Sequence, residues 1–248
     1  MPIASKVKTL VWFMGRPSFY AFMADLIARK LTNAARHEKS RKEAGEWAAL
    51  RAIPLDDALD SVSLSRSPIP SDVLVEAAQR VEGAGVEMGG AGCLDLVYSA
   101  IVSSVAQRVV ETGVAYGWSS AVALAALAKT NGQLVSVDMP YVKEGKESFV
   151  GVAVPPHLRG RWILIRKPDR NGIKQALSKF GGQIDLCHYD SDKSYAGRMY
   201  AYPLLWNALR PGGVFISDDI QDNFAFRDFF GSATVIECQG KYVGLIRK

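Results

Sequence analysis

The stretch RVVETGVAYGWSSAVALAALAKTNGQLVSVDMP, residues 108–140, decides the fold class. It opens with a β-branched run typical of a strand and continues with an alanine- and leucine-rich segment typical of a helix. The pair Asn131-Gly132 ends that helix, and the apolar run LVSVD follows as a second strand. Both strands are nearly continuous apolar runs, which indicates parallel strands covered on both faces.

The same alternation continues along the rest of the chain. Apolar runs at 162–167 (WILIRK), 184–190 (IDLCHYD) and 212–219 (GGVFISDD) are separated by segments with helical spacing. The last two runs, ATVIEC and KYVGLIR, meet at Gln239-Gly240, which predicts a hairpin. The predicted fold is therefore α/β: a doubly wound, mostly parallel, seven-stranded sheet with a C-terminal antiparallel hairpin.

The sequence pattern predicts a helical N-terminal extension over residues 1–85. It predicts the main α/β domain over residues 86–248. Helices are expected at 18–35, 38–50 and 71–82. The first carries an apolar stripe at helical spacing, so we expect the extension to fold over the mouth of the site or to form a homodimer interface. The stripe consists of Phe19, Phe22, Met23, Leu26, Ile27 and Leu31.

Composition and charge narrow the class of protein. The chain has 248 residues, 48% hydrophobic and 22% charged, and no apolar run approaches the ~20 residues that span a membrane. The net charge of +5 arises in residues 1–51, which hold ten Lys and Arg against four Asp and Glu. Because these are not interleaved with stacking aromatics, nucleic acid is not an expected partner. Three scattered cysteines predict no disulfide framework and favour a cytoplasmic location.

Acidic residues follow four of the predicted strands. They are Glu111, Asp138, Asp190, Asp218 and Asp219. In open α/β sheets ligands bind beyond the carboxyl ends of the strands, so acids there lie in a crevice although the strands are buried. A single carboxylate could merely cap the next helix, and Asp218 with Asp219 could do only that. Four acidic strand ends nevertheless indicate a functional site.

The turn after the first strand indicates the ligand. Gly113 and Gly117 lack the G-x-G-x-x-G spacing of a dinucleotide-binding turn, and Glu111 would disfavour a phosphate. A carboxylate suits an ammonium group, and the free N–H groups near Ser119 suit a ligand carboxylate. Asp138 suits ribose hydroxyls. An amino-acid end and a ribose together describe S-adenosylmethionine.

The segments VVETGVAYGWSSA, LVSVDMP and IDLCHYDSDKSY…LLWNALRPGGVFISDDI together resemble a class I S-adenosylmethionine-dependent methyltransferase. They are most similar to small-molecule O-methyltransferases of the catechol, caffeoyl-CoA and macrocin types. The resemblance spans residues 88–248, whereas residues 1–85 match no motif. It implies methylation of a hydroxyl on a small molecule or sugar.

The resemblance also implies roles for individual residues. The cofactor-binding positions are Glu111, Gly113, Gly117, Ser119, Asp138 and Asp169. The ligands of a divalent cation, expected to be Mg²⁺, are Asp190, Asp218 and Asp219. Such an ion would lower the pKa of the acceptor hydroxyl. The base is Lys193 or Asp192, and the choice stays open because many relatives have His at the position of Lys193.

Two other classes of protein share parts of this pattern. A nicotinamide-dependent oxidoreductase would share the sheet and Asp138, although the glycine spacing argues against it. A non-catalytic S-adenosylmethionine-binding protein would keep the cofactor positions, although the intact set of acids argues against a decayed site.

Two residues also have a purely structural interpretation. Lys193 could form a salt bridge to Asp190 or Asp192. His188, on its apolar strand, is interpreted as a core histidine.

Overall fold

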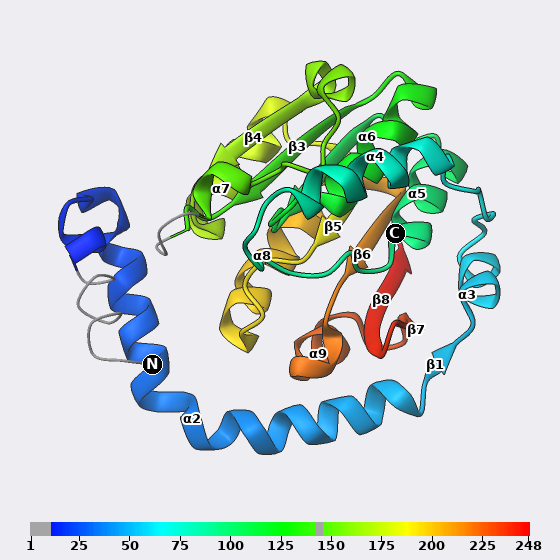
Figure 1. Ribbon diagram of the computed structural model, residues 1–248. Coiled ribbons are helices and arrows are strands. Elements are labelled where there is room, and N and C mark those ends of the chain that lie inside the picture. Colours follow the sequence, from blue (N-terminus) through cyan, green and yellow to red (C-terminus); the bar gives the residue numbers. More distant parts are fainter. Residues whose placement is uncertain (1–10, 142–145) are drawn as a thin grey trace.

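An eight-stranded sheet lies at the centre of the computed structural model, which describes residues 11–141 and 146–248 (Figure 1). In sequence order the strands are β1 (Ala52–Ile53), β2 (Arg108–Thr112), β3 (Gln133–Asp138), β4 (Trp162–Arg166), β5 (Ile184–Tyr189), β6 (Leu209–Ser217), β7 (Thr234–Cys238) and β8 (Lys241–Arg247). Their order across the sheet is β1-β7-β8-β6-β5-β2-β3-β4. Strand β8 runs antiparallel to β6 and β7, and the other neighbours pair in parallel.

The predicted α/β fold with its C-terminal hairpin is confirmed, but the sheet has one strand more than the seven expected. The additional strand, β1, comes from the N-terminal extension and pairs in parallel with β7 through Ala52 and Ile53. Two residues followed directly by Pro54 are too short to produce a strand periodicity in the sequence.

Helices cover both faces of the sheet (Figure 1). On one face α4 (Ser71–Glu82) and α5 (Leu94–Ser103) pack with α6 (Trp118–Thr130). On the other, α7 (Asp169–Lys179), α8 (Tyr195–Ala208) and α9 (Ala225–Phe230) pack together. Successive residues of β5 point to opposite faces, so Leu186 enters one hydrophobic core and Cys187 the other.

Residues 20–49 form one helix, α2 (Tyr20–Ala49), rather than the two expected at 18–35 and 38–50. No glycine or proline lies between the two predicted segments, and most residues there favour a helix, so nothing ends it. Its C-terminal half contacts the short helix η4 (Ile220–Asp222). Of the predicted apolar stripe, Ile27 is half exposed. The side chains of Leu26 and Leu31 lie outside the described residues.

The second half of the extension belongs to the same core as the rest of the chain. Helix α3 (Leu55–Ser61) contacts β7, and α4 contacts α6. Their buried side chains Leu59 and Ala77 lie in the cluster that contains Leu124 of α6. The predicted division at residue 85 therefore stays a prediction, although residues 52–85 are not packed as a separate unit.

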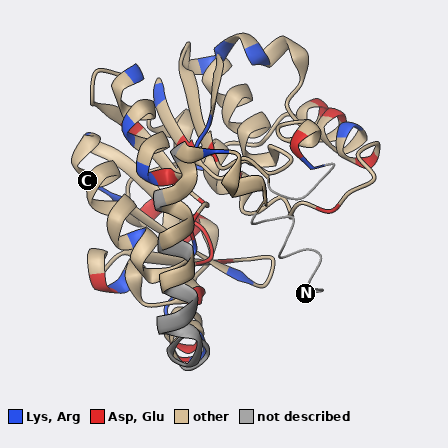
Figure 2. Cartoon of the chain, turned by 90° about the vertical axis from the view of Figure 1, so that its left-hand side faces the viewer, with Lys and Arg blue, Asp and Glu red and all other residues tan. Residues whose placement is uncertain are grey.

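The surface carries mixed charge, and in the view of Figure 2 acidic and basic segments both occur over the outer helices. None of the described helices is both long enough and apolar enough to cross a membrane.

The order of the strands reverses beside β2. The chain runs from β2 to β3 and β4 on one side, and then returns to β5 on the other side of β2. The crevice between the carboxyl ends of β2 and β5 is therefore the topological switch point, where doubly wound sheets bind their ligands.

Candidate active site

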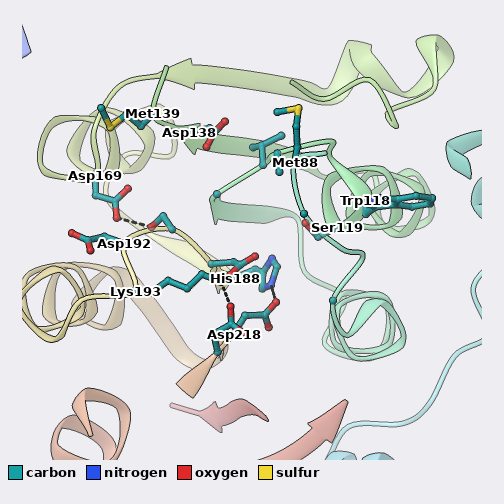
Figure 3. Close-up of a pocket in the computed structure, with 18 of the residues that line it drawn as sticks. Met88, Trp118, Ser119, Asp138, Met139, Asp169, His188, Asp192, Lys193 and Asp218 are labelled. Atoms are coloured by element: carbon teal, nitrogen blue, oxygen red, sulfur yellow. Dashed lines mark hydrogen bonds and ion pairs between the residues drawn. The ribbon is translucent and has the colours of Figure 1, made fainter. Parts of the chain in front are cut away.

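A cavity of about 730 Å³ opens at this switch point. Its wall includes Gly113 and Ser119 from the turn after β2, Asp138 from β3, Asp190 and Lys193 from the loop after β5, and Asp218 from the end of β6. Figure 3 shows that several of these side chains converge from different strands. A volume of this size accommodates a nucleotide-sized ligand together with a small partner.

The turn after β2 is pressed against the loop after β5. Gly113 has a φ of +82°, and a Cβ there would lie 2.2 Å from the carbonyl oxygen of Asp190. The Asp190 backbone N–H donates to the Thr112 carbonyl at 2.8 Å, and Ser191 Oγ lies 2.9 Å from Thr112 Oγ1. Only glycine allows this approach, so the predicted role of Gly113 in shaping the turn has a steric basis. Gly117, with a φ of +84°, precedes α6 directly.

Glu111 lies beneath the turn rather than in the cavity wall. It is 1% exposed, and its oxygens accept hydrogen bonds from the hydroxyls of Ser119 (2.6 Å), Ser120 (2.5 Å) and Ser136 (2.7 Å). Burial alone would raise the pKa of Glu111, but His188 and the serines outweigh it and hold that pKa below its usual range. Glu111 therefore supports the start of α6 from behind.

Asp138 ends β3 and lines the cavity, as expected for a ribose acid. The Arg166 guanidinium donates to its carboxylate and also binds Glu147, with Nε 2.9 Å from Oε1. Burial raises the pKa of Asp138 to about 6, although the Arg166 charge works in the opposite direction. Asp169, at the start of α7, also lines the cavity, and it accepts a hydrogen bond from Ser191 Oγ at 2.5 Å.

The acids expected to bind a metal ion are bound to cations of the chain instead. Lys193 Nζ lies 2.8 Å from Asp190 Oδ1 and also contacts Asp219 Oδ2. Asp219 Oδ1 lies 3.2 Å from Lys241 Nζ, and Asp218 Oδ2 lies 3.4 Å from His188 Nε2. Lys193 therefore forms the salt bridge to Asp190 that the sequence left open.

These contacts do not fit the predicted Mg²⁺ site. Within the described ranges, no three His, Cys, Asp or Glu side chains are arranged to hold a metal ion. The Lys193 ammonium lies between Asp190 and Asp219, and Asp218 faces His188. A divalent cation on all three carboxylates would require Lys193 to move away, because its charge repels the ion.

Asp192 has a local structural role. Its Oδ1 accepts a hydrogen bond from the Ser194 backbone N–H at 3.0 Å, just before α8 begins. A Cβ on Gly197 would lie 2.2 Å from Asp192 Cγ, so this carboxylate packs against the first turn of the helix. It lines the cavity and supports Ser194, whose own side chain caps α8 by accepting a hydrogen bond from the Gly197 backbone N–H at 3.0 Å. Of the two predicted bases, only Lys193 reaches the carboxylates of the cluster.

The sequence analysis missed two functional candidates. His188 is not a satisfied core residue: it lines the cavity with a side chain 4% exposed, between Glu111 and Asp218. Arg198 of α8 is fully buried and donates to the carbonyls of Asp218 (3.1 Å) and Asp219 (2.7 Å). The signal for His188 was its place two residues before Asp190, at the end of a switch-point strand. A helical arginine gives no comparable signal.

The charge of His188 follows from its neighbours. Burial lowers the pKa of His188, but the Asp218 and Glu111 carboxylates outweigh burial and raise it to about 10. The imidazole is therefore positively charged at neutral pH, and it lies between the turn after β2 and the acidic end of β6.

Comparison with known proteins agrees with this geometry. Residues 110–220 match a family model described as a methyltransferase domain. No protein of curated function matches the sequence significantly.

Three solved structures share the fold at low sequence identity. A putative O-methyltransferase from Klebsiella pneumoniae has a TM-score of 0.54 at 18% identity, over 83% of this chain and 99% of that one. The Bacillus cereus O-methyltransferase in complex with SAH has a TM-score of 0.52 at 17% identity, over 81% and 100%. TomG from Streptomyces achromogenes, an O-methyltransferase of tomaymycin synthesis in complex with SAM, has a TM-score of 0.54 at 18% identity, over 78% and 95%.

The sheet order and the switch-point cavity are those of the class I, Rossmann-like methyltransferase fold, which the solved structures share. The match to a methyltransferase domain at residues 110–220 agrees with the predicted class of protein.

Proposed function

We propose that this chain transfers the methyl group of S-adenosylmethionine to a hydroxyl oxygen of a small molecule. One observation carries the proposal: a single cavity joins the glycine turn at Gly113, the strand-end Asp138, and the cluster of Asp190 with Lys193. The first two suit the amino-acid and ribose parts of the donor, and the cluster suits a hydroxyl that must lose a proton.

In the proposed reaction the acceptor oxygen forms a bond to the methyl carbon. The carbon–sulfur bond breaks, its electron pair stays on sulfur, and the hydroxyl proton leaves. The turn residues Gly113, Gly117 and Ser119 would hold the methionine end, Asp138 the ribose, and Asp169 the adenine side. Glu111 supports this turn through Ser119 and does not need to touch the donor.

Lys193 and Asp190 are proposed to act on the acceptor. The Lys193 ammonium would stabilise the negative charge that develops on the acceptor oxygen. Burial and the neighbouring Asp218 charge raise the pKa of Asp190, which makes it a better proton acceptor than an exposed aspartate. The hydroxyl proton would pass to Asp190. The side chains present thus allow transfer without a divalent cation.

A radiochemical assay tests this function and separates it from a metal-assisted reaction. The protein is incubated with S-[methyl-³H]adenosylmethionine and a panel of catechols, phenols and sugar nucleotides, with EDTA or with added Mg²⁺. We expect labelled product in EDTA, and Mg²⁺ to change the rate little. Activity that EDTA abolishes and Mg²⁺ restores would show that Lys193 gives way to an ion on Asp190, Asp218 and Asp219.

Calorimetry separates the remaining classes. We expect S-adenosylmethionine and S-adenosylhomocysteine to bind and NAD not to bind. Binding of NAD alone would favour an oxidoreductase. Tight binding of both adenosyl compounds, with no transfer to any acceptor of the panel, would favour a non-catalytic binding protein.

The extension is proposed to complete the acceptor side of the cavity. Phe22 of α2 lies in the cavity wall, together with Cys93 and Leu94 at the start of α5. Phe22→Ala should weaken acceptor binding severalfold and leave donor affinity unchanged, as calorimetry and KM values would show.

A homodimer through α2 and a cytoplasmic location also remain proposals. Light scattering of the full chain and of a chain lacking residues 1–50 tests the dimer.

A further inference from the structure

A short segment between β3 and β4, residues 150–154, packs on the glycine turn after β2. The Gly151 backbone N–H donates to the Ala115 carbonyl at 2.9 Å, and the Ala153 backbone N–H donates to the Tyr116 carbonyl at 2.8 Å. Two backbone hydrogen bonds therefore join this segment to the turn that is proposed to bind the methionine end of the donor. The position of the turn depends on the position of the segment.

Arg159 holds the same segment through its carbonyl groups. It belongs to the short helix η3 (Pro156–Arg161). Its Nη2 donates to the Gly151 carbonyl at 2.9 Å, and its Nε donates to the Val154 carbonyl at 3.2 Å. One planar guanidinium thus binds two carbonyls of a segment whose N–H groups bind the turn. The Arg159 side chain is exposed, so the hydrophobic core does not require it.

Trp162, the first residue of β4, connects the segment to the hydrogen bonds beneath the turn. Its indole Nε1 donates to Ser136 Oγ at 2.9 Å, and Ser136 Oγ donates to Glu111 Oε2 at 2.7 Å. A Cβ on Gly151 would lie 2.2 Å from Trp162 Cη2, and a Cβ on Gly117 would lie 3.0 Å from Gly151 Cα. Gly151 is therefore in close contact with both the indole ring and the turn.

These two side chains can act on a ligand only through the backbone that they place. Arg159 and Trp162 do not belong to the described residues that line the cavity, whereas Val114 and Ala115 of the turn do. A binding site made of backbone groups works only where the chain is held in one conformation, and a misplacement of about 1 Å is enough to impair it.

We propose that Arg159 and Trp162 are positioning residues of the donor site, which hold residues 150–154 on the glycine turn and thereby fix the backbone that binds the methionine end. The inference rests on the proposed function, because it requires a donor at this turn. The connection between β3 and β4 thus acts on the donor without contacting it.

The variant Arg159→Met tests both steps of this inference. In the ligand-free protein, amide hydrogen exchange at Gly151 and Ala153 should become about tenfold faster, because the segment loses its two charged hydrogen bonds. The Kd of S-adenosylhomocysteine, measured by calorimetry, should rise about tenfold. Arg159→Lys keeps one donor for these carbonyls and should recover part of the affinity. Unchanged exchange at both amides, or a Kd within about twofold of the unmodified protein, would overturn the inference.

A matched control removes the other arginine of η3. Arg161 Nη1 donates to Asn131 Oδ1 at 3.0 Å and to the Gly132 carbonyl at 3.3 Å, beyond the end of α6 that is farther from the turn. Arg161→Met should leave both the exchange rates and the Kd unchanged. If it raises the Kd as much as Arg159→Met does, the effect is one of charge or of general destabilisation, and the positioning role is wrong.

A second variant keeps the test decisive if Arg159→Met does not fold. Trp162→Phe shortens the ring beside Gly151 and removes its N–H donor, so the Kd of S-adenosylhomocysteine should rise about threefold or more. No rise in the folded Trp162→Phe protein contradicts the inference.

The unmodified protein separates the two possible failures. If it binds neither S-adenosylmethionine nor S-adenosylhomocysteine, the proposed function fails first and this inference falls with it. A failure of the inference alone shows as normal binding by the unmodified protein and an unchanged Kd in the folded variants.

Discussion

A buried carboxylate lies at each end of the paired strands β5 and β6, but its surroundings differ between the two ends. At the amino-terminal end, Asp185 accepts hydrogen bonds from the backbone N–H groups of Gln107 (3.0 Å) and Arg108 (2.8 Å), and it binds the guanidinium groups of Arg108 and Arg210. At the carboxyl end, Asp218 Oδ1 and both nitrogens of His188 lack hydrogen-bond partners among the described residues. The first carboxylate is fully hydrogen-bonded by the chain, whereas at the second end several buried polar atoms lack a hydrogen-bond partner among the described residues.

The pKa values follow the same division. Burial would raise the pKa of Asp185, but Arg108, the backbone N–H groups and Arg210 outweigh burial and hold it at about 2. At the carboxyl end burial prevails for Asp138, whose pKa is raised to about 6, and for Asp190, whose pKa is also raised. Asp138 and Asp190 keep raised pKa values although Arg166 and Lys193 are bound to them, and carboxylates in a cleft with raised pKa values are typical of function.

The largest effect is expected at the carboxyl end, from Lys193→Met. Loss of the ammonium beside Asp190 and Asp219 should lower the rate of methyl transfer about 100-fold or more, because charge on the acceptor oxygen loses its stabilising group. Donor affinity should change little. The control is Lys174→Met on the exposed face of α7, which should retain full activity. Equal rates for the two variants would remove Lys193 from the mechanism.

At the amino-terminal end the expected loss is one of stability. Asp185→Ala leaves Arg108 and Arg210 without their partner and should cost about 3 kcal/mol in urea unfolding, with donor affinity unchanged in the folded protein. The stabilisation by Asp185 is present above its unfolded pKa of ~3.9, and it is lost as the pH falls toward about 2. The unmodified protein should therefore lose more stability between pH 4 and pH 2 than the variant does. A matching pH dependence in the variant would show that other carboxylates govern acid unfolding.

Gly113→Ala should affect ligand binding at the carboxyl end of the sheet, because it moves the loop after β5 that carries Asp190. The new Cβ would meet the Asp190 carbonyl oxygen at 2.2 Å, so we expect donor affinity to fall about tenfold or more. Gly181 is the matched control: its φ is +65° and a Cβ there meets nothing within 4 Å. Gly181→Ala should cost about 1 kcal/mol of stability and no affinity. The steric account is wrong if both variants bind the donor equally well.

The smallest effect concerns pH and the donor. The pKa of Asp138 is about 6, so its carboxylate is charged above that pH and protonated below it. A charged carboxylate is the better acceptor for ribose hydroxyls, so donor affinity should fall up to about tenfold between pH 7 and pH 5. Asp138→Asn should bind more weakly and with little pH dependence in this range. Calorimetric measurement of the donor Kd for both proteins at pH 7 and pH 5 tests this prediction.

The sequence predicted the sheet, the hairpin and the acids at the cavity because apolar runs and strand-end residues are local signals. Strand β1 has only two residues, and the undivided helix α2 lacks a glycine or proline to mark any boundary, so neither gave a correct local signal. The partners of Asp190, Asp218 and Asp219 depend on side chains from other strands. Lys241 lies 22 residues after Asp219 in the sequence, and no spacing rule relates the two.

A crystal structure of the complex with S-adenosylhomocysteine, grown with Mg²⁺ present, tests the central claim most directly. The account predicts the amino-acid end of the ligand at the turn of Gly113 and the ribose on Asp138. It also predicts that Lys193 remains between Asp190 and Asp219, with no metal ion among the carboxylates. A ligand bound outside this cavity, or a Mg²⁺ ion on Asp190 and Asp219 with Lys193 turned away, would contradict it.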